Sequence, residues 1–311
     1  MTFDPQATTF SADNAKILGQ AAAMAYEDTQ TCASWAAAQG FTPGTLEFFD
    51  VRDTEGFVVE SDQAMVVAFR GTQPRHPVDW MSDGEVVHAP WAHTVGKVHK
   101  GFYRALDVAW NDDPAHVLPR RLTTHGNKTI WITGHSLGGA LAELCAARAS
   151  FDPAIGRVPI QGVYTFGQPR VGNDAFANLL NDALGSRTYR FVNDRDIVPR
   201  VPFYSMGYRH YGGQTFYDHA GVASTVESAV ESLIIALRFA ERALSIEPLA
   251  QAAGLLGDLV QAAAHGVHLQ DQEQAARARV NAILQSGIEN VSDHDMNPRM
   301  AYIKSSACKN C

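Results

Sequence analysis

Up to about residue 220, short apolar runs alternate with stretches in which apolar residues recur every three or four positions. The runs, bounded by turn-forming residues, predict strands, and the longer spacing predicts helices that bury one face. The predicted strands are 46–51, 56–60, 64–69, 129–133, 160–166 and 188–192, and the predicted helices are 12–27, 101–111, 137–150 and 173–184. Ser11 or Asp13 is expected to cap the first helix, and a polar loop is expected over about 70–96. This alternation predicts a largely parallel sheet covered by helices on both faces.

From about Val222 to Asn290 the chain becomes rich in alanine and keeps a helical period. Its first apolar stripe consists of Val226, Val230, Leu233, Leu237, Ala240 and Leu244. Asp258 interrupts the longest apolar stretch well before the length of a bilayer span, so no transmembrane segment is expected. We therefore expect one domain over residues 1–311, with a helical insertion at 222–290 that packs on itself and on the sheet.

Residues 134–139 read Gly-His-Ser-Leu-Gly-Gly and lie between a predicted strand and a predicted helix. The pattern Gly-x-Ser-x-Gly is typical of a nucleophile elbow, a sharp turn that exposes a serine hydroxyl above the sheet. Gly134 and Gly138 supply the small neighbours that such a strained turn requires. A glycine-rich loop without chemistry is the alternative, but the strand before it and the helix after it favour an α/β-hydrolase fold with Ser136 as the nucleophile.

A serine hydroxyl becomes reactive when a base accepts its proton and a carboxylate orients that base. In hydrolases of this fold the acid follows the serine and the histidine follows the acid, which excludes His135 as the base. Asp194 and Asp196 both follow the predicted strand 188–192, and chain order leaves the two open. It also leaves five histidines open as the base, namely His210, His219, His265, His268 and His294.

The tetrahedral intermediate requires backbone N–H donors for its oxyanion. One donor is the residue after the nucleophile, Leu137, and the other comes from a loop after an earlier strand. The loop Arg70-Gly71-Thr72 closes the predicted strand 64–69, which makes Thr72 the candidate for the second donor. The alternative interpretation of this segment is a plain turn.

Composition restricts the partners of the chain. The net charge of −8 argues against nucleic acids and against strong attraction to anionic membranes, so neutral substrates are favoured. No signal peptide is visible, so a cytoplasmic location is the expectation and a secreted mature form the alternative.

Cys145 is expected to be an inert core thiol. Cys308 and Cys311 form a Cys-x-x-Cys pair without further ligands nearby, so no metal site is expected there. A serine nucleophile with a histidine base needs neither a metal nor an organic cofactor, so no cofactor is expected.

Several segments together resemble the class 3 lipases, the fungal-type triacylglycerol lipase family of the α/β hydrolases. They cover most of residues 12–220, and the most discriminating is 166–173, Phe-Gly-Gln-Pro-Arg-Val-Gly-Asn. The other matching segments are 67–72, 79–83, 98–102, 134–139 and 192–199. The resemblance implies that the acid is Asp196, the base His294 and the second oxyanion residue Thr72. It also implies a lid around 73–87, with Val78, Trp80 and Met81 on its apolar underside.

The resemblance implies a lipase that hydrolyses acylglycerols, with a lipid or small ester as substrate and action at a lipid–water interface as a possibility. An esterase for short or aromatic acyl esters and a phospholipase A1 are the near alternatives, and a catalytically silent lipid-binding or scaffold module is the distant one. One feature departs from the fungal pattern. Asp196 and His294 lie 98 residues apart because the helical insertion separates them. We therefore expect that insertion either to pack as a plain subdomain or to cap the acyl-binding groove or dock onto lipid. The sequence leaves the oligomeric state open.

Overall fold

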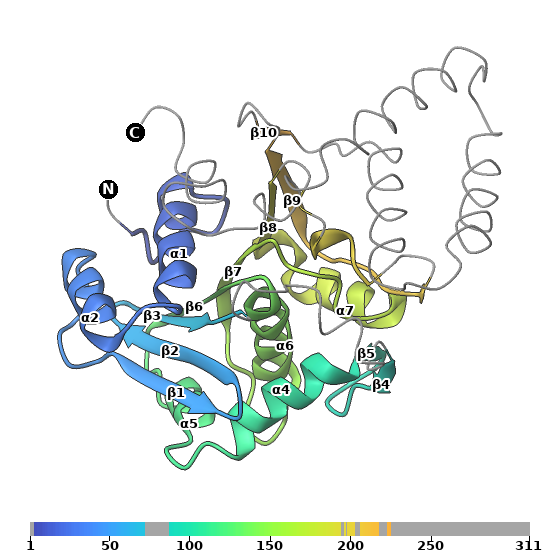
Figure 1. The fold of residues 1–311 in the computed structure, drawn as a ribbon, viewed down its shortest axis with the longest axis horizontal. Coiled ribbons are helices and arrows are strands. Elements are labelled where there is room, and N and C mark those ends of the chain that lie inside the picture. Colours follow the sequence, from blue (N-terminus) through green and yellow to red (C-terminus); the bar gives the residue numbers. More distant parts are fainter. Residues whose placement is uncertain are drawn as a thin grey trace, which may run out of the picture.

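The structure is a computed structural model and describes residues 3–71, 87–193, 196, 198–202, 206–217 and 223–224. Its centre is an eight-stranded sheet in the order β1-β2-β3-β6-β7-β8-β9-β10 (Figure 1). The strands are β1 (Glu47–Val51), β2 (Thr54–Glu60), β3 (Ala64–Phe69), β6 (Thr129–His135), β7 (Ile160–Phe166), β8 (Thr188–Asn193), β9 (Gly213–Tyr217) and β10 (Ala223–Ser224). The five strands from β3 to β9 in this order are parallel, and β1, β2 and β10 pair antiparallel at the two edges. The predicted α/β fold with a largely parallel sheet is therefore confirmed.

Helices cover both faces of this sheet (Figure 1). On one face lie α1 (Ala12–Met24) and α2 (Thr29–Ala38), and on the other α4 (Lys100–Asn111), α5 (Val117–Thr123), α6 (Leu137–Phe151) and α7 (Asp174–Leu184). Strand β3 contributes side chains to the hydrophobic cores on both faces of the sheet. Met65, Val67 and Phe69 enter the α6 side and Val66 and Ala68 the α1 side, because successive side chains of a strand point to opposite faces.

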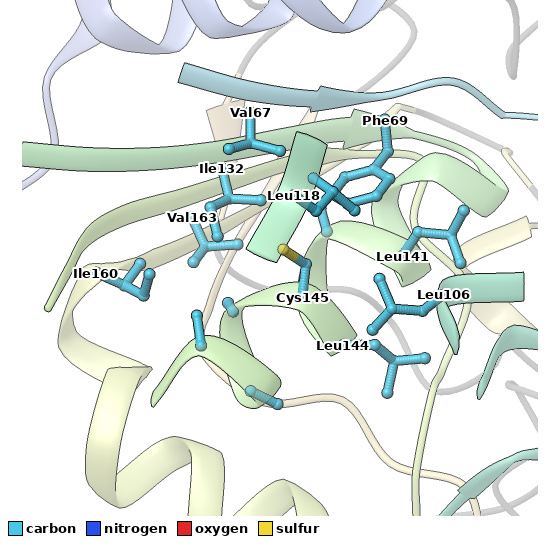
Figure 2. Close-up of a cluster of buried hydrophobic side chains, with 14 of the residues drawn as sticks. Val67, Phe69, Leu106, Leu118, Ile132, Leu141, Leu144, Cys145, Ile160 and Val163 are labelled. Atoms are coloured by element: carbon cyan, nitrogen blue, oxygen red, sulfur yellow. The ribbon is translucent and has the colours of Figure 1, made fainter. Parts of the chain in front are cut away.

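Figure 2 shows the core between the sheet and α6. The strands contribute Val67, Phe69, Ile132, Ile160 and Val163, and the helices contribute Leu106, Leu118, Leu141, Leu144 and Cys145. All of these side chains are at most 2% exposed. Burial also raises the pKa of the Cys145 thiol to about 12, so it stays protonated, in line with the expected inert core thiol. This packing fixes α6, and with it the residue that precedes the helix, against the sheet.

The structure differs from the sequence prediction in several short elements. Helix α1 is capped by Ser11 and ends at Met24 rather than residue 27. The sequence missed α2, which buries only Cys32 and Ala36, and α5, which contains a proline. The predicted loop 70–96 includes part of a small antiparallel pair, β4 (His88–Pro90) and β5 (Lys97–His99). The sequence also missed β9 and the 3-10 turns at Gly185–Arg187 and Val198–Arg200, since none of these segments carries a clear apolar period.

Of the predicted helical insertion at 222–290, only Ala223 and Ser224 lie among the described residues, and they form β10. The insertion and the single domain over 1–311 thus stay predictions. None of the helices within the described ranges is long and apolar enough to cross a membrane.

Candidate active site

Ser136 lies at the junction of β6 and α6, one residue after the strand ends and one before the helix begins. Its φ of 58° and ψ of −128° are rare for a residue with a side chain and cost of order 1–3 kcal/mol. Its N–H donates to the carbonyl of Phe166 on β7 at 2.9 Å, and its own carbonyl accepts from the Gly139 N–H at 2.9 Å. The neighbouring strand and the first helical turn therefore hold the strained conformation in place.

The two glycines of the motif allow the strand and the helix to approach closely. A Cβ on Gly134 would lie 2.2 Å from the Gly138 carbonyl oxygen, and a Cβ on Gly138 would lie 2.3 Å from the Phe69 carbonyl oxygen. In both cases the obstacle is backbone, which cannot rotate away as a side chain can. A larger residue at Gly134 would push α6 away from β6, and one at Gly138 would push it away from β3, so the glycines set the position of Ser136.

The Ser136 side chain is enclosed. The residue is 1% exposed, and its Oγ has no hydrogen-bond partner among the residues that the structure describes. Ser136 occupies the N-cap position of α6, a helix of 15 residues. The N-terminal end of a helix carries partial positive charge and stabilises negative charge that develops nearby. As the first helical residue, Leu137 has an N–H without an acceptor within the helix, which suits it to bind an oxyanion.

Asp196 follows β8 on the same sheet edge as Ser136, because β6, β7 and β8 are neighbouring parallel strands. The residue is fully buried, its N–H donates to the Asn193 carbonyl at 2.9 Å, and its Oδ1 accepts the Val198 N–H at 2.9 Å. These bonds hold the carboxyl group in the turn. The other candidate acid, Asp194, lies outside the described residues.

Among the five candidate bases the structure describes only His210; His219, His265, His268 and His294 lie outside the described residues. The His210 Nε2 is 2.7 Å from the Pro199 carbonyl oxygen, so this nitrogen is the donor and carries the proton. Burial, together with the charges of Arg190 and Arg170, holds its pKa well below the usual range. A ring that resists protonation in this way is poorly suited to accept a proton from Ser136.

The loop after β3 lies directly against the elbow. A Cβ on Gly71 would lie 2.6 Å from the His135 carbonyl oxygen and 3.0 Å from the Ser136 Cβ. The loop that was expected to supply the second oxyanion donor is thus next to the nucleophile, while Thr72 itself lies outside the described residues. The same holds for the predicted lid residues Val78, Trp80 and Met81.

No pattern in the sequence pointed to Tyr26, which joins the two sides of the site. The Gly71 N–H donates to the Tyr26 Oη at 3.1 Å, and the Oη is 2.9 Å from the His135 Nδ1. Tyr26 therefore contacts the residue before Thr72 and the residue before Ser136. Because α1 ends at Met24, Tyr26 belongs to the turn after the helix rather than to its last turn.

The described part of the chain contains no cluster of three or more His, Cys, Asp or Glu residues that could hold a metal ion. Cys32 and Cys145 are buried and free, and burial raises the pKa of Cys32 to about 11. Cys308 and Cys311 lie outside the described residues.

Comparison with known proteins gives matches over the same region. Residues 66–206 match the family model described as lipase (class 3). Triacylglycerol lipase OBL1 of Arabidopsis thaliana is 32% identical over 196 residues, which cover 50% of this chain and 37% of the relative. The lipase of Rhizomucor miehei is 35% identical over 165 residues, which cover 52% of this chain and 44% of that lipase. The chain therefore spans less than half the length of these two curated relatives.

The fold comparison agrees with the sequence comparison. A solved triacylglycerol lipase, whose catalytic centre is described as a serine protease triad, matches with a TM-score of 0.56 and 28% identity. The match covers 72% of this chain and 88% of the other. A fungal lipase–inhibitor complex matches with a TM-score of 0.57, also at 28% identity.

Proposed function

Because the chain belongs to the class 3 lipase family, we propose that it is a serine carboxylester hydrolase, and specifically a lipase that hydrolyses acylglycerols. The observation that carries the proposal is the strained backbone of Ser136 at the junction of β6 and α6, since a residue keeps such a conformation only where the surrounding structure enforces it. The names of the relatives, which include a triacylglycerol lipase, support the substrate class.

In the proposed reaction the Ser136 Oγ attacks the ester carbonyl carbon, and His294 takes the hydroxyl proton. Asp196 orients the imidazole and stabilises its charged form, and the N–H groups of Thr72 and Leu137 stabilise the oxyanion. The tetrahedral intermediate expels the alcohol, which takes the proton from His294 and leaves an acyl-enzyme on Ser136. A water molecule then gives a proton to His294 and attacks the acyl carbon. The fatty acid leaves as His294 returns that proton to the Ser136 Oγ, which restores the enzyme. No metal or organic cofactor enters these steps.

Two features support these roles. Asp196 is held on the same sheet edge as Ser136 with its carboxyl group bonded to the Val198 N–H. The loop that leads to Thr72 packs against the elbow through Gly71. His294 enters through the order of residues typical of the fold and through the resemblance of its surroundings to the family pattern.

A fluorophosphonate probe, which reacts with activated serines, tests the mechanism. We expect stoichiometric labelling of the wild-type protein, none of Ser136→Ala, and normal labelling of Ser150→Ala, a control at the other end of α6. Ser136→Ala should lower kcat by on the order of 10⁶. His294→Ala should lower kcat by a comparable factor. His125→Ala, in a turn between α5 and β6, should leave kcat unchanged. Absence of labelling in the wild type would indicate a silent lipid-binding module instead.

Substrate preference is tested with nitrophenyl esters of increasing chain length, emulsified triacylglycerol and phospholipid vesicles. A lipase is expected to prefer long chains and to gain activity when the substrate exceeds its solubility. Activity confined to short soluble esters would identify an esterase, and release of the sn-1 acyl chain from phospholipid alone would identify a phospholipase A1.

A further inference from the structure

Glu143 is a carboxyl group inside the core, on the same helix as the nucleophile. It lies in the middle of α6 and is 1% exposed. Burial raises its pKa to about 8, although the charge of Arg190 on β8 and a hydrogen bond from Gln168 oppose that shift. Burying a carboxyl group is unfavourable unless its hydrogen bonds are made, so the contacts of Glu143 matter.

The Gln168 amide supplies the hydrogen bond, since its Nε2 donates to the Glu143 carboxyl group. Gln168 also packs against the first turn of α6, where a Cβ on Gly139 would lie 2.9 Å from the Gln168 Cβ. Gly139 and Glu143 are four residues apart and therefore share one face of the helix. This face of α6 contacts Gln168 twice, at Gly139 next to the elbow and at Glu143 one turn further along.

Gln168 begins the connection that reaches the candidate acid. Two residues later, the Arg170 N–H donates to the Val201 carbonyl at 2.8 Å, and its guanidinium group donates to the carbonyls of Arg200 and Pro202. These three carbonyls belong to the segment that follows Asp196. The Asp196 carboxyl group in turn accepts the Val198 N–H from that same segment.

We propose that Glu143 is a positioning residue, which holds Gln168 on α6 and thereby fixes the segment that carries Asp196 relative to Ser136. This inference rests on the proposed ester hydrolase activity, because its effect is on the orientation of the acid. The connection starts on α6 and ends at the segment after Asp196, so the helix that presents the nucleophile also helps to determine where the acid lies. Small displacements of catalytic groups lower the rate strongly even when the substrate still binds.

Steady-state kinetics on a soluble nitrophenyl ester test the proposal in the full-length protein. Ser136→Ala comes first: loss of its hydrolysis establishes the activity, and retained hydrolysis would refute the proposed function itself. Given that activity, Glu143→Met should lower kcat by on the order of tenfold with KM within about twofold. Glu143→Gln keeps a hydrogen-bonding amide and should stay within about threefold of the wild-type kcat. Asp152→Asn, a buried carboxylate at the C-terminal end of α6, is the matched control.

A reciprocal exchange keeps the test decisive if Glu143→Met does not fold. Gln168→Glu alone places two carboxyl groups together in the core and should lower kcat, whereas Glu143→Gln combined with Gln168→Glu restores an amide–carboxyl pair and should recover at least half of the wild-type value. Glu143→Met with kcat within about twofold of the wild type, or an exchange variant as impaired as Gln168→Glu, would overturn the proposal.

Discussion

Replacing Tyr26 with Phe tests how the two sides of the candidate site are joined. In the structure the Tyr26 Oη accepts the Gly71 N–H at 3.1 Å and lies 2.9 Å from the His135 Nδ1. The hydroxyl therefore joins a backbone N–H of the loop after β3 to a ring nitrogen of the residue before the nucleophile. The variant removes one oxygen atom, and with it the hydrogen bond from the Gly71 N–H and the contact with the His135 Nδ1.

A buried polar group left without a hydrogen bond costs about 1–3 kcal/mol. Tyr26 is only partly buried, so water can replace part of what is lost, and we expect the free energy of unfolding to fall by about 2 kcal/mol. Gly71 directly precedes Thr72, the proposed oxyanion donor, and a loosened loop should lower kcat by about ten- to a hundredfold.

The assay compares Tyr26→Phe with Tyr189→Phe, which also removes one hydroxyl hydrogen bond, here to the Ser186 carbonyl on the surface. Thermal unfolding and kcat on a soluble nitrophenyl ester are measured for both variants. If Tyr26→Phe keeps kcat within about twofold of Tyr189→Phe, the hydroxyl does not position the oxyanion loop and this account of the site is wrong.

Three further predictions concern the elbow glycine, the buried Glu143 and the predicted helical insertion. Gly138→Ala puts a Cβ 2.3 Å from the Phe69 carbonyl oxygen, so it should destabilise the fold by about 1–3 kcal/mol in thermal melts and slow fluorophosphonate labelling; an unchanged labelling rate would refute the packing argument. The pKa of Glu143 is raised from its ordinary 4.5 to about 8, so its protonated form favours the folded state. The free energy of unfolding of the wild type, relative to that of Glu143→Gln, should therefore be greatest below pH 4.5 and fall as the pH rises through 8. If the difference in free energy between the two proteins does not vary with pH, this reasoning is wrong. Deletion of residues 226–286 should abolish any preference for emulsified over soluble ester if the predicted insertion caps the site, and a preference that survives would exclude that role.

The sequence by itself determined the elements whose signals are local. Strands β3, β6 and β7 appear as apolar runs because they are buried on both faces, and α4 and α7 show a helical stripe because they are buried on one. The elbow was visible because two glycines at fixed spacing are required where backbone meets backbone. Short elements such as α2 and β9 were missed, since they bury too little apolar surface in a regular pattern.

Within the candidate site, chain order limited the acid to Asp194 or Asp196 but could not say what surrounds either one. Only the tertiary structure brought Tyr26 between Gly71 and His135, which are 45 and 109 residues away in the sequence. It likewise paired Glu143 with Gln168 and placed His210 where burial and two guanidinium groups lower its pKa. Such contacts depend on how the helices and strands pack together. A hydrogen bond between distant residues leaves no periodicity in the sequence, so the packing alone decided which polar groups meet.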